Sequence, residues 1–292
     1  MDGRGGITAE LVQRLLAEQA PQWADLPVVP VPQDGWDNRS YRLGDELTVR
    51  LPSHERYAAA VAKEDRWLPV LAPQLPLPIP EPVFAGRPSA AYPMPWSVRR
   101  WLPGEPATGR TVADPVRFAG DLSGFLRALW GADATGGPAA GVHSFFRGCP
   151  PSHYDEETRR RIDHLAGRVD GPAALAVWQD ALGSTWTGRP VWFHGDVAVG
   201  NLMVDRGELA AVIDFGTCGV GDPACDLVIA WTFLEGRART AFAEAVDLDR
   251  GAWARARGWA LWKALISVTD DPVASAEPLR VLAEVLADPI LA

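Results

Sequence analysis

The sequence predicts an α+β protein of two lobes, with a small lobe of antiparallel strands followed by a larger, mostly helical lobe. Over the first hundred residues, short β-branched and aromatic runs alternate with two helical patterns, and turn signals such as Asp34-Gly35 and Gly44-Asp45 separate them. After that, apolar residues recur mainly at helical spacing. We therefore expect one lobe over 1–101, a second over 102–292, and a ligand-binding cleft where they meet.

The elements of the first lobe follow from local patterns. A helix over 7–20 places four apolar residues on one face and has Thr8 as its N-cap. Strands are expected near 28–33, 38–43 and 46–51. A second helix would begin after Ser53, its expected N-cap, and end near Pro69. The run "WSVRRWL" then predicts a strand that Pro103-Gly104 ends.

The second lobe reads as a series of helices with one β interruption. Helices are expected over 114–133 and near 155–168, 171–182, 224–234, 238–247, 250–268 and 274–287. The runs "NLMV" and "LAAVIDF" flank the turn "DRGE" and predict a β-hairpin in the middle of this lobe.

Composition excludes several classes of protein. The chain has 292 residues, 28 of them basic and 37 acidic, and its net charge of −9 argues against a nucleic-acid-binding role. Three separated cysteines favour neither disulfides nor a zinc site, so we expect a reducing, cytoplasmic location. The apolar stretch 67–85 holds six prolines, which rules out a membrane helix there.

Three polar residues carry the chemistry. Asp196 precedes Asn201 by five residues, and Asp214 opens an Asp-Phe-Gly triplet thirteen residues after Asn201. Each alone would be read as structural, but carboxylate and amide oxygens are the ligands that Mg²⁺ prefers, and a further carboxylate can orient a hydroxyl. This order and spacing is that of the protein-kinase catalytic loop. The sequence therefore predicts phosphoryl transfer, with the predicted hairpin bringing Asn201 and Asp214 to one end.

The segments "FHGDVAVGNLMV" and "AVIDFGTCGVGDPACDL" resemble motifs of the aminoglycoside phosphotransferase family. That family shares a protein-kinase-like fold with choline, homoserine and methylthioribose kinases. The resemblance implies that Asp196 is the catalytic residue and that Asn201 and Asp214 bind Mg²⁺. It also implies that His194 and Asp226 support the catalytic loop, Asp226 through backbone hydrogen bonds.

The resemblance also implies how ATP or GTP is bound. Arg50 stands where the family usually carries Lys, and Glu64 resembles the Glu that pairs with this cation; Lys63 and Glu55 are the alternatives.

A turn with Gly35, Asn38 and Tyr41 resembles the family's phosphate-side turn, where Asn38, Arg39 and Ser40 offer donors. A plain hairpin with Tyr41 in the core is the alternative.

The purine base would bind the Arg100 carbonyl and the Leu102 amide.

The acceptor is the open question. Aminoglycoside sites in this family are acidic and lie in the helical lobe; the candidate ligands here are Asp155, Glu156, Glu157, Glu235, Asp270 and Asp271. Each also fits a solvated surface charge. The loop "GDVAVGN" lacks the His of the commoner family form, which points to a different acceptor. An antibiotic, a sugar, a choline-like or homoserine-like acceptor, and a non-catalytic nucleotide-binding protein all stay open.

Overall fold

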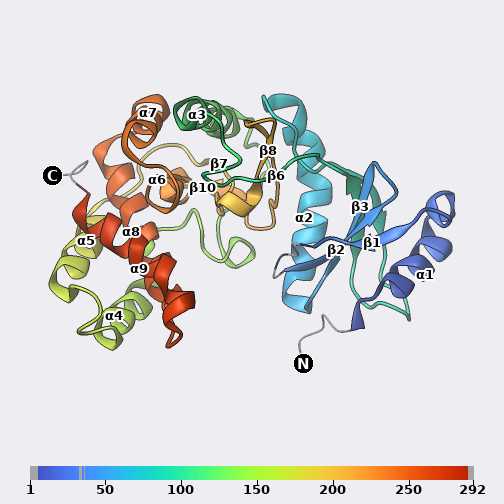
Figure 1. Cartoon of the computed structure of the whole chain (residues 1–292), viewed down its shortest axis with the longest axis horizontal. Coiled ribbons are helices and arrows are strands. Elements are labelled where there is room, and N and C mark those ends of the chain that lie inside the picture. The colour runs from blue at the N-terminus through green and yellow to red at the C-terminus, as the bar shows by residue number, and fades with distance from the viewer. Residues whose placement is uncertain (1–5, 33–34, 36, 289–292) are drawn as a thin grey trace. The chain divides into compact units, whose positions relative to one another are not determined.

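A computed structural model describes residues 6–32, 35 and 37–288, and the chain forms two compact units (Figure 1). The first unit runs to Glu105 and includes Ala210–Gly216, and the second holds Pro106–Leu209 and the chain from Thr217 on. Most strands belong to the first unit and most helices to the second, which confirms the predicted α+β class. The predicted turn at Asp34 and the end of the strand predicted over 28–33 include residues outside the described ones.

The first unit is built on a five-stranded antiparallel sheet with the order β1-β2-β3-β5-β4. Its strands and two helices are α1 (Ala9–Gln19), β1 (Val28–Pro30), β2 (Asn38–Leu43), β3 (Leu47–Pro52), α2 (Glu55–Leu71), β4 (Pro82–Gly86) and β5 (Trp96–Arg100). Short 3₁₀ turns follow α1 and α2, at Pro21–Trp23 and Ala72–Gln74. The predicted strands and both helices are confirmed to within a few residues.

Alternation along the strands gives the sheet two different faces. Val49 and Leu51 of β3 are fully buried in the core that also contains the apolar face of α1. Side chains along a strand point alternately to opposite faces, so Arg50 lies on the other side. There α2 packs on β3, β4 and β5. The sheet thus separates an apolar layer from a charged one.

The helix caps are partly as predicted. Thr8 caps α1, since its side chain accepts a hydrogen bond from the Leu11 amide at 3.3 Å. The predicted cap of α2 was wrong by one residue: His54, not Ser53, takes the position, and its Nδ1 accepts from the Arg56 amide. The ring nitrogen of histidine serves because His54 is the last extended residue before the helix.

The second unit is mostly helical. Its helices are α3 (Pro115–Gly131), α4 (Asp155–His164), α5 (Gly171–Gly183), α6 (Ile229–Thr232), α7 (Gly236–Val246), α8 (Arg250–Ser267) and α9 (Pro272–Ala287). Four short 3₁₀ turns join them, at Val142–Ser144, Pro151–Tyr154, Val199–Asn201 and Pro223–Val228. Helix α8 packs against α4, α5 and α9, while α3 and α7 lie side by side (Figure 1).

Two small sheets complete the chain. β7 (Val191–Phe193) pairs with β10 (Gly219–Gly221), and β6 (Glu105–Pro106), β8 (Leu202–Asp205) and β9 (Glu208–Val212) form the other. Strands β8 and β9 confirm the predicted hairpin, while β6 was not predicted, because two residues beside a proline carry no strand pattern.

The helix predicted over 224–234 was wrong in its form. The chain instead winds in a 3₁₀ turn from Pro223 to Val228 and then in the single α-helical turn of α6. Asp222 caps this turn by accepting from the Ala224 amide and also pairs with Arg255, and Asp226 accepts from the loop after β7. Spacing of apolar residues cannot distinguish such a segment from an α-helix.

No helix among residues 6–32 and 37–288 combines the length and the apolar character that crossing a membrane requires.

We expect Gly86→Ala to destabilise the first unit. A Cβ at Gly86 would lie 2.1 Å from the indole of Trp96, which is fully buried and pairs with Gly86 across β4 and β5. Overpacking of this kind costs about 1–3 kcal/mol, and urea unfolding of the purified chain would measure it. Gly124→Ala is the control, because no atom lies within 4 Å of its Cβ position in α3 and Ala is the better helix former. Equal unfolding midpoints for the two variants would contradict the expectation.

Candidate active site

A buried carboxylate fixes the loop that follows β7. Asp226 accepts hydrogen bonds from the backbone amides of His194 (3.0 Å) and Gly195 (2.7 Å) and from Trp130 Nε1 (3.2 Å). Asp226 has no solvent exposure, and this burial raises its pKa although these donors and the nearby His194 oppose the shift. The loop is therefore tied to the start of the 3₁₀ turn at Pro223–Val228.

Gly195 and His194 shape the turn itself. Gly195 has φ +85°, and a Cβ there would come within 2.9 Å of the Thr217 carbonyl oxygen, so the site needs glycine. The buried His194 accepts from the Asp196 amide at Nδ1 (3.2 Å), and its carbonyl accepts from Thr217 Oγ1 (3.0 Å). These contacts fix the backbone of the turn that carries Asp196.

Asp196 is held by two side chains. Its Oδ1 accepts from Lys263 Nζ of α8 at 2.6 Å, and its Oδ2 accepts from Asn201 Nδ2 at 3.2 Å. Asn201 Nδ2 also donates to the Asp196 carbonyl at 2.9 Å. Burial opposes ionisation of Asp196, but the charge and hydrogen bond of Lys263 outweigh it and hold its pKa below the usual value.

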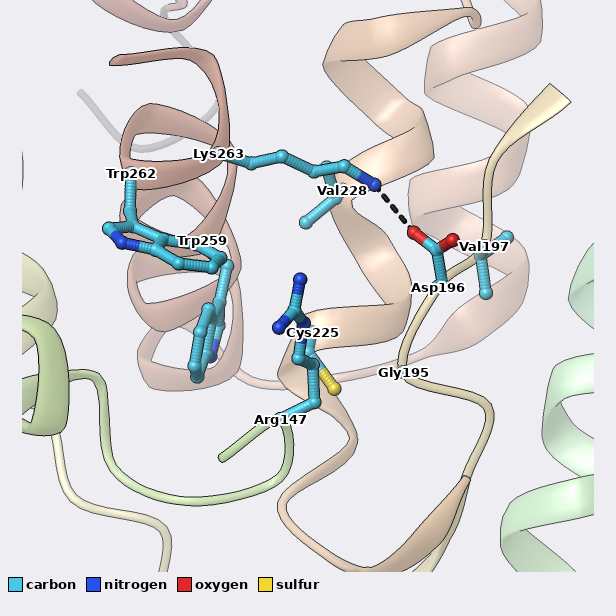
Figure 2. Close-up of a pocket in the computed structure, with 9 residues that line it drawn as sticks. All are labelled: Arg147, Gly195, Asp196, Val197, Cys225, Val228, Trp259, Trp262 and Lys263. Atoms are coloured by element: carbon cyan, nitrogen blue, oxygen red, sulfur yellow. Dashed lines mark hydrogen bonds and ion pairs between the residues drawn. The ribbon is translucent and has the colours of Figure 1, made fainter. Parts of the chain in front are cut away.

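Asp196 lies at the edge of a cavity in the second unit (Figure 2). The residues that line it are Arg147, Gly195, Asp196, Val197, Cys225, Val228, Trp259, Trp262 and Lys263. Sequence reasoning found Asp196 but missed Lys263 and Arg147. A signal for Lys263 existed: it is one of two lysines in the chain, and it interrupts the apolar run "ALWKALI".

The acidic residues predicted to bind the acceptor do not line this cavity. Glu157 accepts from Trp262 Nε1 at 2.8 Å, so it positions a wall residue from behind. Asp155 accepts from Trp178 Nε1 and Arg159 Nε, each at 2.8 Å. The other four, Glu156, Glu235, Asp270 and Asp271, are exposed, with Glu235 and Asp271 at helix starts.

In the first unit, Glu64 of α2 joins two arginines. It lies 3.5 Å from Arg50 Nη1 and accepts from Arg99 through both oxygens, at 2.9 and 3.1 Å. Burial opposes the ionised form of Glu64, but the charges of Arg99 and Arg50 lower its pKa to about 2. Arg99 was not predicted, although strand alternation places it on the same face as Ser97 and Arg50.

Arg50 also contacts the Asp-Phe-Gly segment, which belongs to the first unit. Its Nη2 donates to Asp214 Oδ1 at 3.2 Å. Burial opposes the charged form of Arg50, but Glu64 and Asp214 together raise its pKa. Asp214 has φ +65°, a left-handed conformation that non-glycine residues adopt rarely and that recurs at functional sites.

Lys63 and Glu55, the alternatives to Arg50 and Glu64 for the nucleotide-binding ion pair, have other roles in the structure. Lys63 donates from Nζ to the Gly216 carbonyl at 2.8 Å, which ties α2 to the residue after Asp214-Phe215. Glu55 is the exposed first residue of α2. Arg50 is thus the cation that pairs with both Glu64 and Asp214, and Lys63 holds the segment next to it.

The other nucleotide-binding candidates lie along the sheet. Asn38 and Ser40 belong to β2, where Ser40 pairs with Arg50 in register, while Tyr41 is buried in the core as the alternative reading expected. Arg100 ends β5, where its amide donates to the Glu81 carbonyl at 3.2 Å, and Leu102 follows two residues later. Contact of these residues with a nucleotide stays a prediction.

Asp65, next to Glu64, is a partly buried carboxylate with poor hydrogen bonding. Its buried Oδ1 has no hydrogen-bond partner among the described residues and lies 3.9 Å from Arg99 Nη2. Burial raises the pKa of Asp65 to about 6, against the opposing charge of Arg99 and with the help of Glu64.

Comparisons with known proteins give a family match and similar folds. The family model described as the phosphotransferase enzyme family matches residues 28–259. An aminoglycoside 3'-phosphotransferase from Escherichia coli is 39% identical over 46 residues, which are 16% of this chain and 17% of that enzyme.

Two solved structures resemble nearly the whole chain. A GDP complex of an aminoglycoside 2'-phosphotransferase-IIIa matches with a TM-score of 0.74 at 17% identity, over 96% of this chain and 99% of that one. A macrolide 2'-phosphotransferase from Brachybacterium faecium matches with a TM-score of 0.59 at 21% identity, over 94% and 97%. At these identities the likeness shows a shared fold.

We expect Asp65→Asn to stabilise the chain above pH 6. The pKa rises from 3.8 to about 6 on folding, so the folded chain keeps a proton that the unfolded chain has released, and stability falls as pH rises through this window. At neutral pH the ionised group costs about 3 kcal/mol. Urea unfolding from pH 4 to 8 should show that the difference in free energy of unfolding between Asp65→Asn and wild type grows with pH. The control is Asp163→Asn, at an exposed position, for which we expect no such growth. A difference that does not change with pH would contradict this.

Proposed function

The chain belongs to the phosphotransferase enzyme family, and we propose that it transfers the γ-phosphate of ATP or GTP to a hydroxyl group of a small molecule. The observation that carries this proposal is the Asp196 carboxylate, held at a cavity by Asn201, Lys263 and a loop that Asp226 fixes. A carboxylate fixed at a cavity and kept ionised is suited to orient an acceptor hydroxyl.

The chemical step needs little from the protein besides positioning and charge. The acceptor hydroxyl oxygen attacks the γ-phosphorus, the bond from that phosphorus to the β–γ bridging oxygen breaks, and the hydroxyl proton passes to Asp196. The products are a phosphate monoester and a nucleoside diphosphate. His194 and Asp226 act as positioning residues, because they contact the loop and not the reacting atoms.

We propose that Arg50 binds the α- and β-phosphates. Its Nη1 lies beside Glu64 and its Nη2 donates to Asp214, while Arg99 bonds both oxygens of Glu64. Two carboxylates thus orient the Arg50 guanidinium, whose planar donors suit phosphate oxygens. Asn38 and Ser40 would add donors from β2, and the Arg100 carbonyl and Leu102 amide would bind the base. The structure of the aminoglycoside 2'-phosphotransferase named above contains GDP, which supports a nucleotide co-substrate.

Mg²⁺ fits the donor set of the chain. Asp214 offers a carboxylate and Asn201 an amide oxygen, since the Nδ2 of Asn201 is the atom that bonds to Asp196. No group of three or more His, Cys, Asp or Glu suited to a metal occurs among the described residues. Mg²⁺ needs none, because it takes one or two protein oxygens and completes its shell with water and phosphates. When bound, it would neutralise charge on the transferring phosphate.

The proposed acceptors are hydroxyl-bearing antibiotics first, because relatives and structural neighbours are named for aminoglycosides and macrolides. Sugars and choline-like or homoserine-like alcohols are the metabolic alternative. The reaction would occur in the cytoplasm, where nucleoside triphosphates are supplied. The Arg50 that replaces the usual Lys is the one feature that favours a nucleotide-binding protein without transfer.

Asp196→Ala should abolish transfer and leave nucleotide binding intact. The assay is nucleoside diphosphate release by the purified chain with Mg²⁺, ATP or GTP, and a panel of aminoglycosides, macrolides, sugars and amino alcohols. Loss of a positioned general base lowers the rate about 10²–10⁴-fold. Asp205→Asn, an exposed acid at the end of β8, is the control. Unchanged turnover in Asp196→Ala would refute the role, and lack of nucleotide binding by wild type would refute the kinase function.

Asp214→Ala should weaken Mg²⁺-nucleotide binding, whereas Asp196→Ala should not. Calorimetric titration of nucleotide with and without Mg²⁺ separates the two roles. In Asp214→Ala we expect the gain from Mg²⁺ to fall by at least about tenfold, as for loss of a charged ligand. An equal Mg²⁺ effect in wild type and Asp214→Ala would remove Asp214 from the metal site.

A further inference from the structure

The cavity beside Asp196 carries more positive than negative charge. Of its nine lining residues, Asp196 is acidic, and Arg147 and Lys263 are basic. Lys263 is bound to Asp196 at 2.6 Å, so these two charges largely compensate each other. Figure 2 shows Arg147 on the other side of the cavity, between the indoles and the Asp196 loop. The guanidinium of Arg147 forms no ion pair with a carboxylate among the described residues, although its charge also helps to lower the pKa of Asp196.

The chain holds Arg147 in place with an unusual loop. The two residues before it, Phe145 and Phe146, both have positive φ, at 47° and 56°. Each such non-glycine residue costs of order 1 kcal/mol and persists only where its surroundings determine it. Gly148 follows with φ +78°, and a Cβ there would lie 2.1 Å from the Phe193 ring. A flexible surface arginine would need none of these constraints.

Aromatic contacts complete the support. The Arg147 guanidinium lies 5.0 Å from the ring centre of Trp262, and its Nη1 donates to the Phe145 carbonyl at 3.2 Å. Trp262 stacks on Tyr154 at 4.2 Å. The second wall indole, Trp259, has a buried Nε1 without a hydrogen-bond partner among the described residues. Asp196 is the one carboxylate among the residues that line this cavity.

An acceptor hydroxyl that reaches Asp196 has to share or displace Lys263. Separating Lys263 from its partner without a replacement leaves a half-buried charge uncompensated, which is costly. An anionic group on the same acceptor would replace Asp196 as the partner of Lys263 and would also bind Arg147. A polycation offers no such replacement and would meet two cations of its own sign.

We propose that the acceptor carries an acidic group, a carboxylate or a phosphate ester, beside the hydroxyl that is phosphorylated, and that Arg147 and Lys263 bind this group. The proposal rests on the proposed function, since it names the acceptor class of the same site. It places acid-bearing alcohols ahead of polycationic aminoglycosides among the acceptors considered above.

The first test measures binding and does not depend on transfer. The full-length chain is titrated calorimetrically with inorganic phosphate, with malate as a hydroxy-carboxylate, and with kanamycin as a polycation. We expect at least one anion to bind and Arg147→Met to weaken it by about tenfold or more, as for a lost charged hydrogen bond. Arg206→Met, in the exposed turn after β8, is the matched control and should bind as wild type does.

Further variants keep the test decisive if Arg147→Met folds poorly. Arg147→Lys retains the charge without the planar guanidinium and should bind anions with intermediate affinity. Lys263→Met should weaken anion binding without altering the loop that carries Arg147. Phosphate binding without malate binding would assign the site to phosphate esters, and the reverse to carboxylates. No anion binding, binding equal in wild type and the Arg147 and Lys263 variants, or kanamycin binding that these variants do not strengthen would overturn the proposal.

The second test separates this proposal from the proposed function. Nucleoside diphosphate release is compared for glucuronate, glucose, glucosamine and glucose 6-phosphate, which share ring hydroxyls and differ in charge, and for kanamycin. Turnover confined to acid-bearing acceptors, with KM raised in Arg147→Met, supports both. Anion binding at Arg147 without any transfer would support the anion site and count against the phosphotransferase function. Turnover confined to neutral or cationic acceptors would support the phosphotransferase function and overturn the proposal that the acceptor carries an acidic group.

Discussion

The hydrogen bonds from two consecutive backbone amides to Asp226 are the interaction on which the candidate site depends. Amides at a tight turn have no helix or sheet partner, so a buried carboxylate that accepts both fixes the turn in one conformation. Burial makes this carboxylate costly to keep charged, and the same donors offset that cost. The position of Asp196, the bond from Asn201 and the ion pair with Lys263 all follow from this one turn.

In the first unit the corresponding constraint is charge balance on one face of a sheet. Glu64 stays ionised inside the protein because Arg99 and Arg50 surround it. Arg99 satisfies both oxygens of the carboxylate, so Arg50 is held at a longer distance and can also reach Asp214. An arginine suits this role because its planar guanidinium can contact two carboxylates at once. The compact ammonium group of a lysine would do this less well.

The sequence predicted features that depend on local pattern. Helices and strands followed from periodicity, and Asp196, Asn201 and Asp214 from spacing, with their roles still predictions. What it missed depends on distant partners. Lys263 lies 67 residues from Asp196, and Arg99 lies 35 residues from Glu64. Local pattern marks Lys263 by its apolar neighbours and Arg99 by strand alternation, but it does not identify the partners that they meet in the folded chain. The acidic acceptor candidates lie outside the lining of the cavity for the converse reason, because Glu157 and Asp155 bond to indoles that only the folded chain brings to them.

The net charge of the chain and the charges that line the cavity favour different acceptors. A chain of charge −9 suggests a cationic ligand, and aminoglycosides are cationic. Yet exposed charges more than a Debye length, about 8–10 Å, from the cavity are screened by salt, whereas Arg147 and Lys263 line the cavity itself. Within a half-buried site the effective dielectric constant is lower, so the charges that line the cavity act more strongly than distant exposed acids. In the proposed anion site, Arg147 and Lys263 therefore matter more for the choice of acceptor than the total charge of the chain.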